Sequence, residues 1–190
     1  MEYPFIQPPV HKKFTEMTRE EAQAHFAWFT EQIPARIAIL EAAIQATPGY
    51  DSWKADGTPH SLVLLGKWFY QKIIFAERDS PPLPVVLPDG AAPTKTAGRE
   101  LTAETVSIVM DVAMYLSQAL FRSIPDLKWK LGAGSKWDVN YQQVVIVGKG
   151  PLPFNPFHII LVYAFGVMDR TWGPNRLREL YTIWFNSLSK

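Results

Sequence analysis

Two short stretches of the sequence, GSKWDVN and DRTWGPNR, place a tryptophan among charged residues in predicted loops. Six residues there have side chains suited to contacting another protein: Lys136, Trp137, Asp138, Arg170, Trp172 and Arg176. Tryptophan and arginine carry much of the binding energy of protein interfaces, so we expect these residues to contact a partner, with Lys136 at the rim. Trp53, in YDSWKADG, lies in a similar setting. The alternative is that these tryptophans pack as lids over the edge of the core.

Signatures of catalysis and of cofactor binding are missing from the sequence. LGAGSKW lacks the G-x-x-x-x-G-K-[ST] order of a phosphate-binding loop, and Ser135 lacks the G-x-S-x-G setting of a serine nucleophile. The chain has no cysteine, and its 4 histidines do not show the H-E-x-x-H spacing of a zinc site. We therefore expect a protein that is not an enzyme and that binds neither a cofactor nor a metal.

Two titratable residues fall within predicted helices, and we expect each to have an ordinary structural role. Asp111 lies between Met110 and Val112, off the apolar stripe of its helix, so we expect it to face solvent. His25 lies beside Phe26 and is expected to be a partly buried structural histidine.

The composition indicates one globular domain over residues 1–190, with an irregular, mobile, proline-rich excursion near residues 79–98. Hydrophobic residues make up 47% of the chain and aromatic residues 13%, which is enough for a core. The net charge of +1 gives no field that favours nucleic acid or a membrane, and no apolar run reaches the ~20 residues that cross a bilayer. The lack of cysteine and of a secretory signal pattern predicts a cytoplasmic protein.

Capping signals and prolines predict the helices of the first half of the chain. Thr18 and the glutamate three residues later form a capping box that begins a helix. Pro34 is expected to end or kink this helix and to begin a second one, so that two helices meet there. Thr58 and Pro59 mark the start of a third helix, in which Gly66 is expected to be a weak point.

The middle of the second half changes from a helical to a strand-like period. Residues 101–124 carry apolar side chains at alternating steps of three and four, which predicts a central helix ended by Pro125. Residues 127–131 and 141–147 are predicted to be antiparallel strands, joined by a loop over residues 132–140 whose glycines let the backbone adapt.

The stretch GPLPFNPFHIILVYAFG carries a helix-start signal before an apolar run. Asn155 is a good cap and Pro156 a good first residue, so we expect a substantially buried helix that runs to about Met168. Residues 174–188 predict a final amphipathic helix. The predicted fold is therefore α+β, with five or six helices packed around a small antiparallel sheet or hairpin.

A family resemblance is carried by four stretches: MTREEAQAHFAWFTEQIPARIAIL, GTPHSLVLLGKWF, MYLSQALFRSIPDLKW and PLPFNPFHII. In this order they resemble small bacterial cytoplasmic proteins that look like immunity proteins encoded beside polymorphic toxins, including Rhs-type and type VI effectors. The resemblance implies a protein that binds and inhibits a cognate toxin in a stoichiometric complex, and it carries over no functional residue. Many immunity proteins of basic nucleases are acidic, whereas this chain is nearly neutral, so we expect a toxin of mixed surface charge.

Two other classes of function stay open at this point. An enzyme of unfamiliar type, such as a hydrolase that reverses a toxin's modification, would need titratable residues that converge in one pocket. The candidates are scattered along the sequence, and three of them would have to lie within hydrogen-bond reach: Asp111, Asp138, His158 and Asp169. A structural subunit that oligomerises would bury, between its copies, the apolar side chains that its own core does not cover. The sequence does not determine the oligomeric state.

Overall fold

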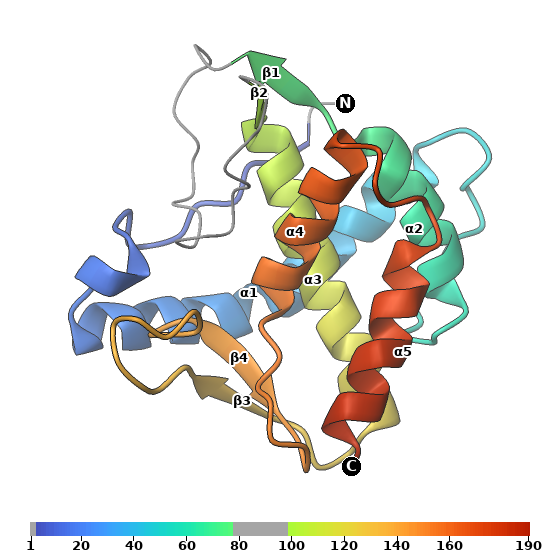
Figure 1. Ribbon diagram of the computed structural model, residues 1–190. Coiled ribbons are helices and arrows are strands. Elements are labelled where there is room, and N and C mark those ends of the chain that lie inside the picture. The colour runs from blue at the N-terminus through green and yellow to red at the C-terminus, as the bar shows by residue number, and fades with distance from the viewer. Residues whose placement is uncertain (1–2, 78–98) are drawn as a thin grey trace.

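Helix α3, Ala103–Ser123, runs through the middle of the molecule and contacts α1, α2, α4 and α5 (Figure 1). The computed structural model describes residues 3–77 and 99–190. The side chain of Thr102 caps α3 by accepting a hydrogen bond from the amide of Thr105. Side chains are buried around nearly the whole circumference of the helix, which confirms that it is central.

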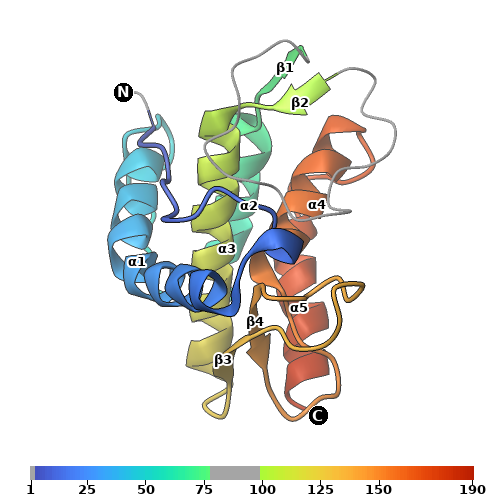
Figure 2. The ribbon, with the colours of Figure 1, turned by 90° about the vertical axis from the view of Figure 1, so that its left-hand side faces the viewer.

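Helix α1, Arg19–Gln45, is one bent helix rather than two. The capping box at Thr18 begins it, as predicted. Pro34 lies inside it, so the prediction that two helices meet there is wrong, although the chain changes direction within α1 (Figure 2). Proline removes one backbone hydrogen bond and crowds the carbonyl four residues earlier, which kinks a helix. The helix continues because it buries side chains along the same face on both sides of the proline, with Ile33 before it and Leu40 after it.

Helices α2, Ser61–Lys72, and α5, Arg176–Leu188, pack against each other near a glycine. A Cβ atom on Gly66 would lie 2.5 Å from the backbone oxygen of Pro174, so only glycine allows this approach. Gly66, which was expected to weaken α2, is therefore needed for the close packing of α2 against the backbone at Pro174. The helix begins after its predicted start, but the Thr58 hydroxyl still accepts a hydrogen bond from the first amide of α2 at 3.3 Å.

Helix α4, Pro156–Met168, begins as predicted and packs against α3. The side chain of Asn155 accepts a hydrogen bond from the amide of His158 at 3.0 Å, and Pro156 fills the first helical position. Apolar side chains on several sides of the helix are buried, as the apolar run predicted: Phe157, Ile160, Leu161, Ala164, Phe165 and Met168. The capping signal therefore prevails over the β-branched content of this run.

Two antiparallel sheets of two strands each complete the fold. Strand β3, Lys128–Leu131, pairs with β4, Val144–Val147, as predicted but over shorter spans. Strand β1, Phe75–Glu77, pairs with β2, Arg99–Leu101, and was not predicted because each has only three residues. The excursion predicted for residues 79–98 lies outside the described residues. Within the described ranges five α-helices and these sheets form an α+β fold, as predicted.

Asp111 is 0% exposed, so the expectation that it faces solvent is wrong. Its carboxylate accepts two hydrogen bonds of 2.7 Å from the Arg36 guanidinium of α1 and another from the Tyr3 hydroxyl. Burial raises the pKa of Asp111 to about 6, although Arg36 acts in the opposite direction. This side of α3 is covered by α1 and by the N-terminal segment, residues 3–17, which the helical period alone does not reveal.

Candidate protein-interaction site

The hairpin loop, residues 132–143, connects β3 to β4 and is closed at its base by backbone hydrogen bonds. The amide of Gly132 donates to the carbonyl of Gln143 at 2.7 Å, and the amide of Gln142 donates to the carbonyl of Gly132 at 3.0 Å. A Cβ atom on Gly132 would lie 1.7 Å from the backbone oxygen of Asn140. This glycine therefore permits a close backbone contact that fixes the base of the loop.

The tip of the hairpin loop is built from tight turns around Asp138. The Asp138 amide donates to the carbonyl of Ser135 at 2.9 Å, and its carbonyl accepts from the amide of Tyr141 at 3.0 Å. Its carboxylate accepts a hydrogen bond of 2.8 Å from the amide of Asn140, an arrangement that stabilises a turn. Asp138, predicted as a contact residue, thus also shapes the loop.

Two glutamines fasten the hairpin loop to the rest of the molecule. The Gln142 amide group donates hydrogen bonds of 2.8 and 2.9 Å to the carbonyls of Phe14 and Met17 in the N-terminal segment. The side-chain oxygen of Gln143 accepts a hydrogen bond of 2.8 Å from the side-chain amide of Asn155, the residue that caps α4. Neither glutamine was predicted from the sequence as a site residue. Two consecutive amide side chains directly before a β-branched run were a signal that could have been used.

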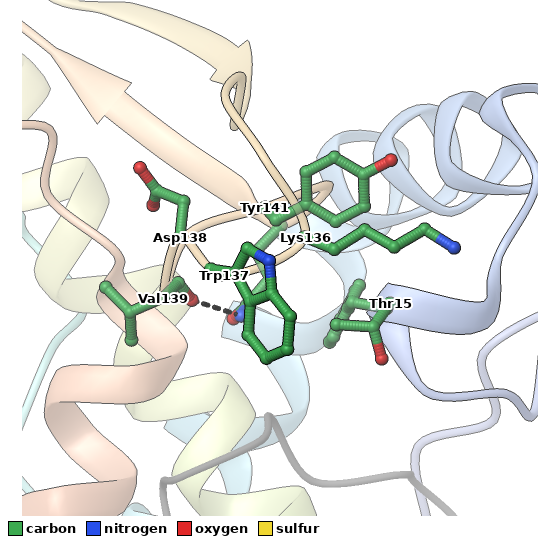
Figure 3. Close-up of a pocket in the computed structure, with 8 residues that line it drawn as sticks. Thr15, Lys136, Trp137, Asp138, Val139 and Tyr141 are labelled. Carbon is green, nitrogen blue, oxygen red and sulfur yellow. Dashed lines mark hydrogen bonds between the residues drawn. The ribbon is translucent and has the colours of Figure 1, made fainter.

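Trp137 projects from this fastened loop into solvent, with 95% of its surface exposed. Figure 3 shows the side chains of Lys136 and Trp137 leaving the loop on the side on which Thr15 of the short helix η1, Phe14–Glu16, lies. Between them is an open groove of about 540 Å³, formed by the loop and η1 and lined by Phe14, Thr15, Lys136, Trp137, Asp138, Val139, Tyr141 and Gln143. Three of the six predicted contact residues thus meet in one groove.

The α4–α5 loop, residues 169–175, holds Trp172 in a different way. A Cβ atom on Gly166 would lie 2.3 Å from the Trp172 ring, so the indole is packed directly onto α4. The guanidinium of Arg176 lies 4.6 Å from the centre of the same ring, a cation–π contact. It also forms an ion pair of 3.1 Å with Glu179. Trp172 is half-buried and contacts the core, as the alternative of a lid predicts.

The two predicted arginines of this region have different surroundings. Arg176 and Trp172 line a shallow cavity of about 270 Å³, and the Arg176 Nε atom is buried without a partner among the described residues. Arg170 has an exposed side chain and a positive φ of 57°. Its amide donates to the carbonyl of Val167 at 3.0 Å, so its backbone terminates α4.

The six predicted contact residues therefore form two clusters rather than one. Asn155, at the start of α4, is hydrogen-bonded to the hairpin loop, and the α4–α5 loop follows Met168 at the other end of the same helix. The 13 residues of α4, roughly 20 Å of helix, lie between the two clusters.

Trp53, the third loop tryptophan, is 2% exposed. Its indole N–H donates to the carbonyl of Ser61 at 3.0 Å, and its ring packs edge-on against Tyr115 of α3. This tryptophan is part of the core and does not belong to an interaction surface.

The titratable residues that an enzyme would need lie in separate environments. Asp111 is held by Arg36 and Tyr3, and the Asp138 carboxylate is held within the hairpin loop. Burial lowers the pKa of His158, and its Nδ1 has no partner in the part of the chain that the structure describes. The described ranges contain no group of three histidine or carboxylate side chains that could hold a metal ion.

His25 lies beneath the hairpin loop and is buried, as predicted for a structural histidine. Its ring packs edge-on against Phe14 and lies 5.3 Å from that of Trp28, between ring centres. Burial lowers the pKa of His25 to about 4, so the ring is neutral near pH 7.

Comparisons of the chain with models of protein families, with curated proteins and with solved structures gave no match. Across residues 3–77 and 99–190, every helix is too short or too polar to span a bilayer.

Proposed function

We propose that this protein acts in the cytoplasm by binding another protein through the hairpin loop, with Trp137 as the central contact. Following the family resemblance, the partner is a toxin encoded beside it, which it inhibits in a stoichiometric complex. The observation that carries the proposal is the exposure of Trp137 on a loop whose base, tip and flanks are all hydrogen-bonded.

The energetic reason lies in the area of the indole ring. A tryptophan side chain can bury on the order of 200 Å² at an interface, which at about 25 cal/mol per Å² corresponds to about 5 kcal/mol before entropy is subtracted. The hydrogen bonds of Gln142 and Gln143 order the loop in advance, so less conformational entropy is lost on binding. An exposed ring on an ordered loop is therefore well suited to binding.

The charges beside Trp137 indicate the kind of surface that it contacts. Lys136 and Asp138 flank the ring with opposite charges, and the whole chain has a formal net charge of +1. Such a rim suits a partner of mixed surface charge, since complementary charges improve the specificity of a complex.

Co-expression with the product of the neighbouring gene tests the proposal. We expect the two proteins to co-purify in a fixed ratio, and we expect the protein to protect cells from the neighbour's toxicity. Trp137→Ala should weaken the complex by about 2 kcal/mol, roughly 30-fold in Kd. Ile183→Ala is the matched control, because Ile183 is also an exposed apolar residue, at 49%, but lies on α5. A neighbour that is neither bound nor neutralised contradicts the proposal.

A further inference from the structure

Among the strands of residues 3–77 and 99–190, β3 pairs only with β4, so one edge of its sheet is open. In an antiparallel pair, alternate residues direct their backbone groups toward the partner strand and away from it. The N–H of Ile146 in β4 donates to the carbonyl of Phe154 at 2.7 Å, and the C=O of Ile146 accepts from the amide of Phe154 at 2.8 Å. Phe154 lies on the side of β4 that faces away from β3. Trp129 lies opposite Ile146, so its own backbone groups point away from β4, and those of Leu131 do the same two residues later.

The outward backbone groups of Trp129 and Leu131 make no hydrogen bond to any residue within ranges 3–77 and 99–190. Free N–H and C=O groups along a strand edge form a template for an additional strand from another chain. Recognition of extended peptides by such an edge takes its affinity from main-chain hydrogen bonds.

The two faces of β3 are chemically different. Trp129 lies on the inner face, where its ring packs 5.6 Å from that of Phe29 and 5.3 Å from that of Phe121, between ring centres. Lys128 and Lys130 lie on the other face and are exposed. An incoming strand would therefore have every second side chain next to a lysine.

Neither Lys128 nor Lys130 forms an ion pair with a residue in the described ranges. Asp126, two residues before the strand, lies 3.7 Å from Lys149, which offsets its charge. Lys128 and Lys130 remain as the charges along the strand itself.

We propose that the open edge of β3 binds an acidic, extended segment of the partner protein. The segment adds a strand beside Trp129 and Leu131 and places glutamate or aspartate side chains next to Lys128 and Lys130, as favourable pairs of opposite charge. This inference rests on the proposed function, because β3 leads directly into the hairpin loop and the segment belongs to the protein that contacts Trp137.

The same charges disfavour a second copy of this chain as the occupant. Two β3 strands paired edge to edge would bring the lysines of both copies side by side, and like charges on neighbouring strands are destabilising. Lysine on an edge strand is a common means of preventing such self-association. A nucleic acid would engage the lysines but leave the outward backbone groups of Trp129 and Leu131 unpaired.

The test uses the ¹⁵N-labelled full-length protein and an end-blocked octapeptide of alternating glutamate and valine or threonine. We expect the peptide to shift the amide signals of Trp129 and Leu131 and to slow their hydrogen exchange. Methylating alternate peptide nitrogens should weaken binding at least tenfold, since it blocks the main-chain bonds. Lys128→Glu/Lys130→Glu should do the same.

The matched control is Lys54→Glu/Lys67→Glu, which changes the net charge equally at exposed lysines elsewhere and should bind the peptide normally. Three results would overturn the inference: peptide-induced shifts confined to other residues, a wild-type dimer paired through β3, or a single-stranded oligonucleotide that displaces the peptide. A partner that needs Trp137 but tolerates Lys128→Glu/Lys130→Glu also refutes the added strand, while it leaves the proposed function intact.

Discussion

The hairpin loop and the α4–α5 loop both carry a tryptophan between charged residues, yet the two rings have different fates. The Trp172 ring packs between Gly166 and Arg176, so it fixes the α4–α5 loop to one end of α4. Trp137 lies at the other end of α4 on a loop that is held by its backbone and by two glutamines, and its ring is left in water.

The difference shows that what fixes a loop decides what its aromatic residue can do. Where the ring itself holds the loop to the core, it cannot leave without loss of stability. Where backbone and amide hydrogen bonds hold the loop, the ring is free to contact a partner.

The largest effect is expected from Asp111→Ala, which removes the support of the N-terminal segment. This segment provides the Thr15 wall of the hairpin-loop groove and is tied to α3 through the Tyr3 hydroxyl. Breaking a buried ion pair on one side leaves Arg36 uncompensated, so we expect a loss of about 3–5 kcal/mol in the free energy of unfolding. Urea denaturation followed by circular dichroism measures it.

The control for this prediction is the double variant Arg36→Met/Asp111→Leu, which removes both charges. It should recover much of the lost stability, because apolar groups of similar volume can replace a buried ion pair. If the double variant is as unstable as Asp111→Ala, packing or the unpaired hydroxyl of Tyr3, rather than the charge of Arg36, explains the loss.

Acid is expected to weaken the hairpin-loop end through His25, which shares a small buried space with Gln143 and Phe14. The pKa of His25 is about 4 in the folded protein and 6.5 as the reference, so the unfolded chain binds the proton first. Stability is therefore lost as the pH falls from 6.5 to 4, by about 3 kcal/mol for this site.

The measurement compares the pH dependence of urea unfolding in the wild type and in His25→Phe. Other groups, including Asp111 with its opposite sign, titrate in both proteins and cancel in the difference. Equal losses in the two proteins over this pH range would show that His25 does not control the acid response.

Trp172→Ala is expected to lower the free energy of unfolding by about 2 kcal/mol, less than for a fully buried tryptophan because the ring is half-buried. Partner affinity should stay unchanged, since the residue acts as a lid on α4. Thermal unfolding and a binding titration separate the two effects. A weakened complex without a fall in Tm would instead place Trp172 in the interface.

Trp137→Ala should have the smallest effect on folding, below about 0.5 kcal/mol, because the ring makes almost no contact within the protein. Its effect should appear in partner binding alone. Thermal unfolding of the isolated variant checks this, with Trp172→Ala measured in parallel. Equal losses of Tm in the two variants would remove the contrast between the loops.

Structural features that depend on a few residues close together in the sequence were predicted correctly. The capping box at Thr18, the start of α4 at Asn155 and the pairing of β3 with β4 are each set by residues close together in the chain. The residue types of the candidate site were also predictable, because Lys136 and Trp137 stand in a loop between two strand-like stretches.

The tertiary structure alone decided which side chains are covered. The exposure of Asp111, Trp53 and Trp137 depends on distant parts of the chain. Arg36 and Tyr3 cover Asp111, and the Ser61 carbonyl and Tyr115 cover Trp53, whereas Trp137 is 95% exposed. Helical period and loop composition report on local conformation, whereas burial depends on elements that approach from elsewhere in the chain. The sequence therefore determined the starts of α1 and α4 and the pairing of β3 with β4, whereas only packing decided that α1 continues through Pro34 and which tryptophan remained exposed.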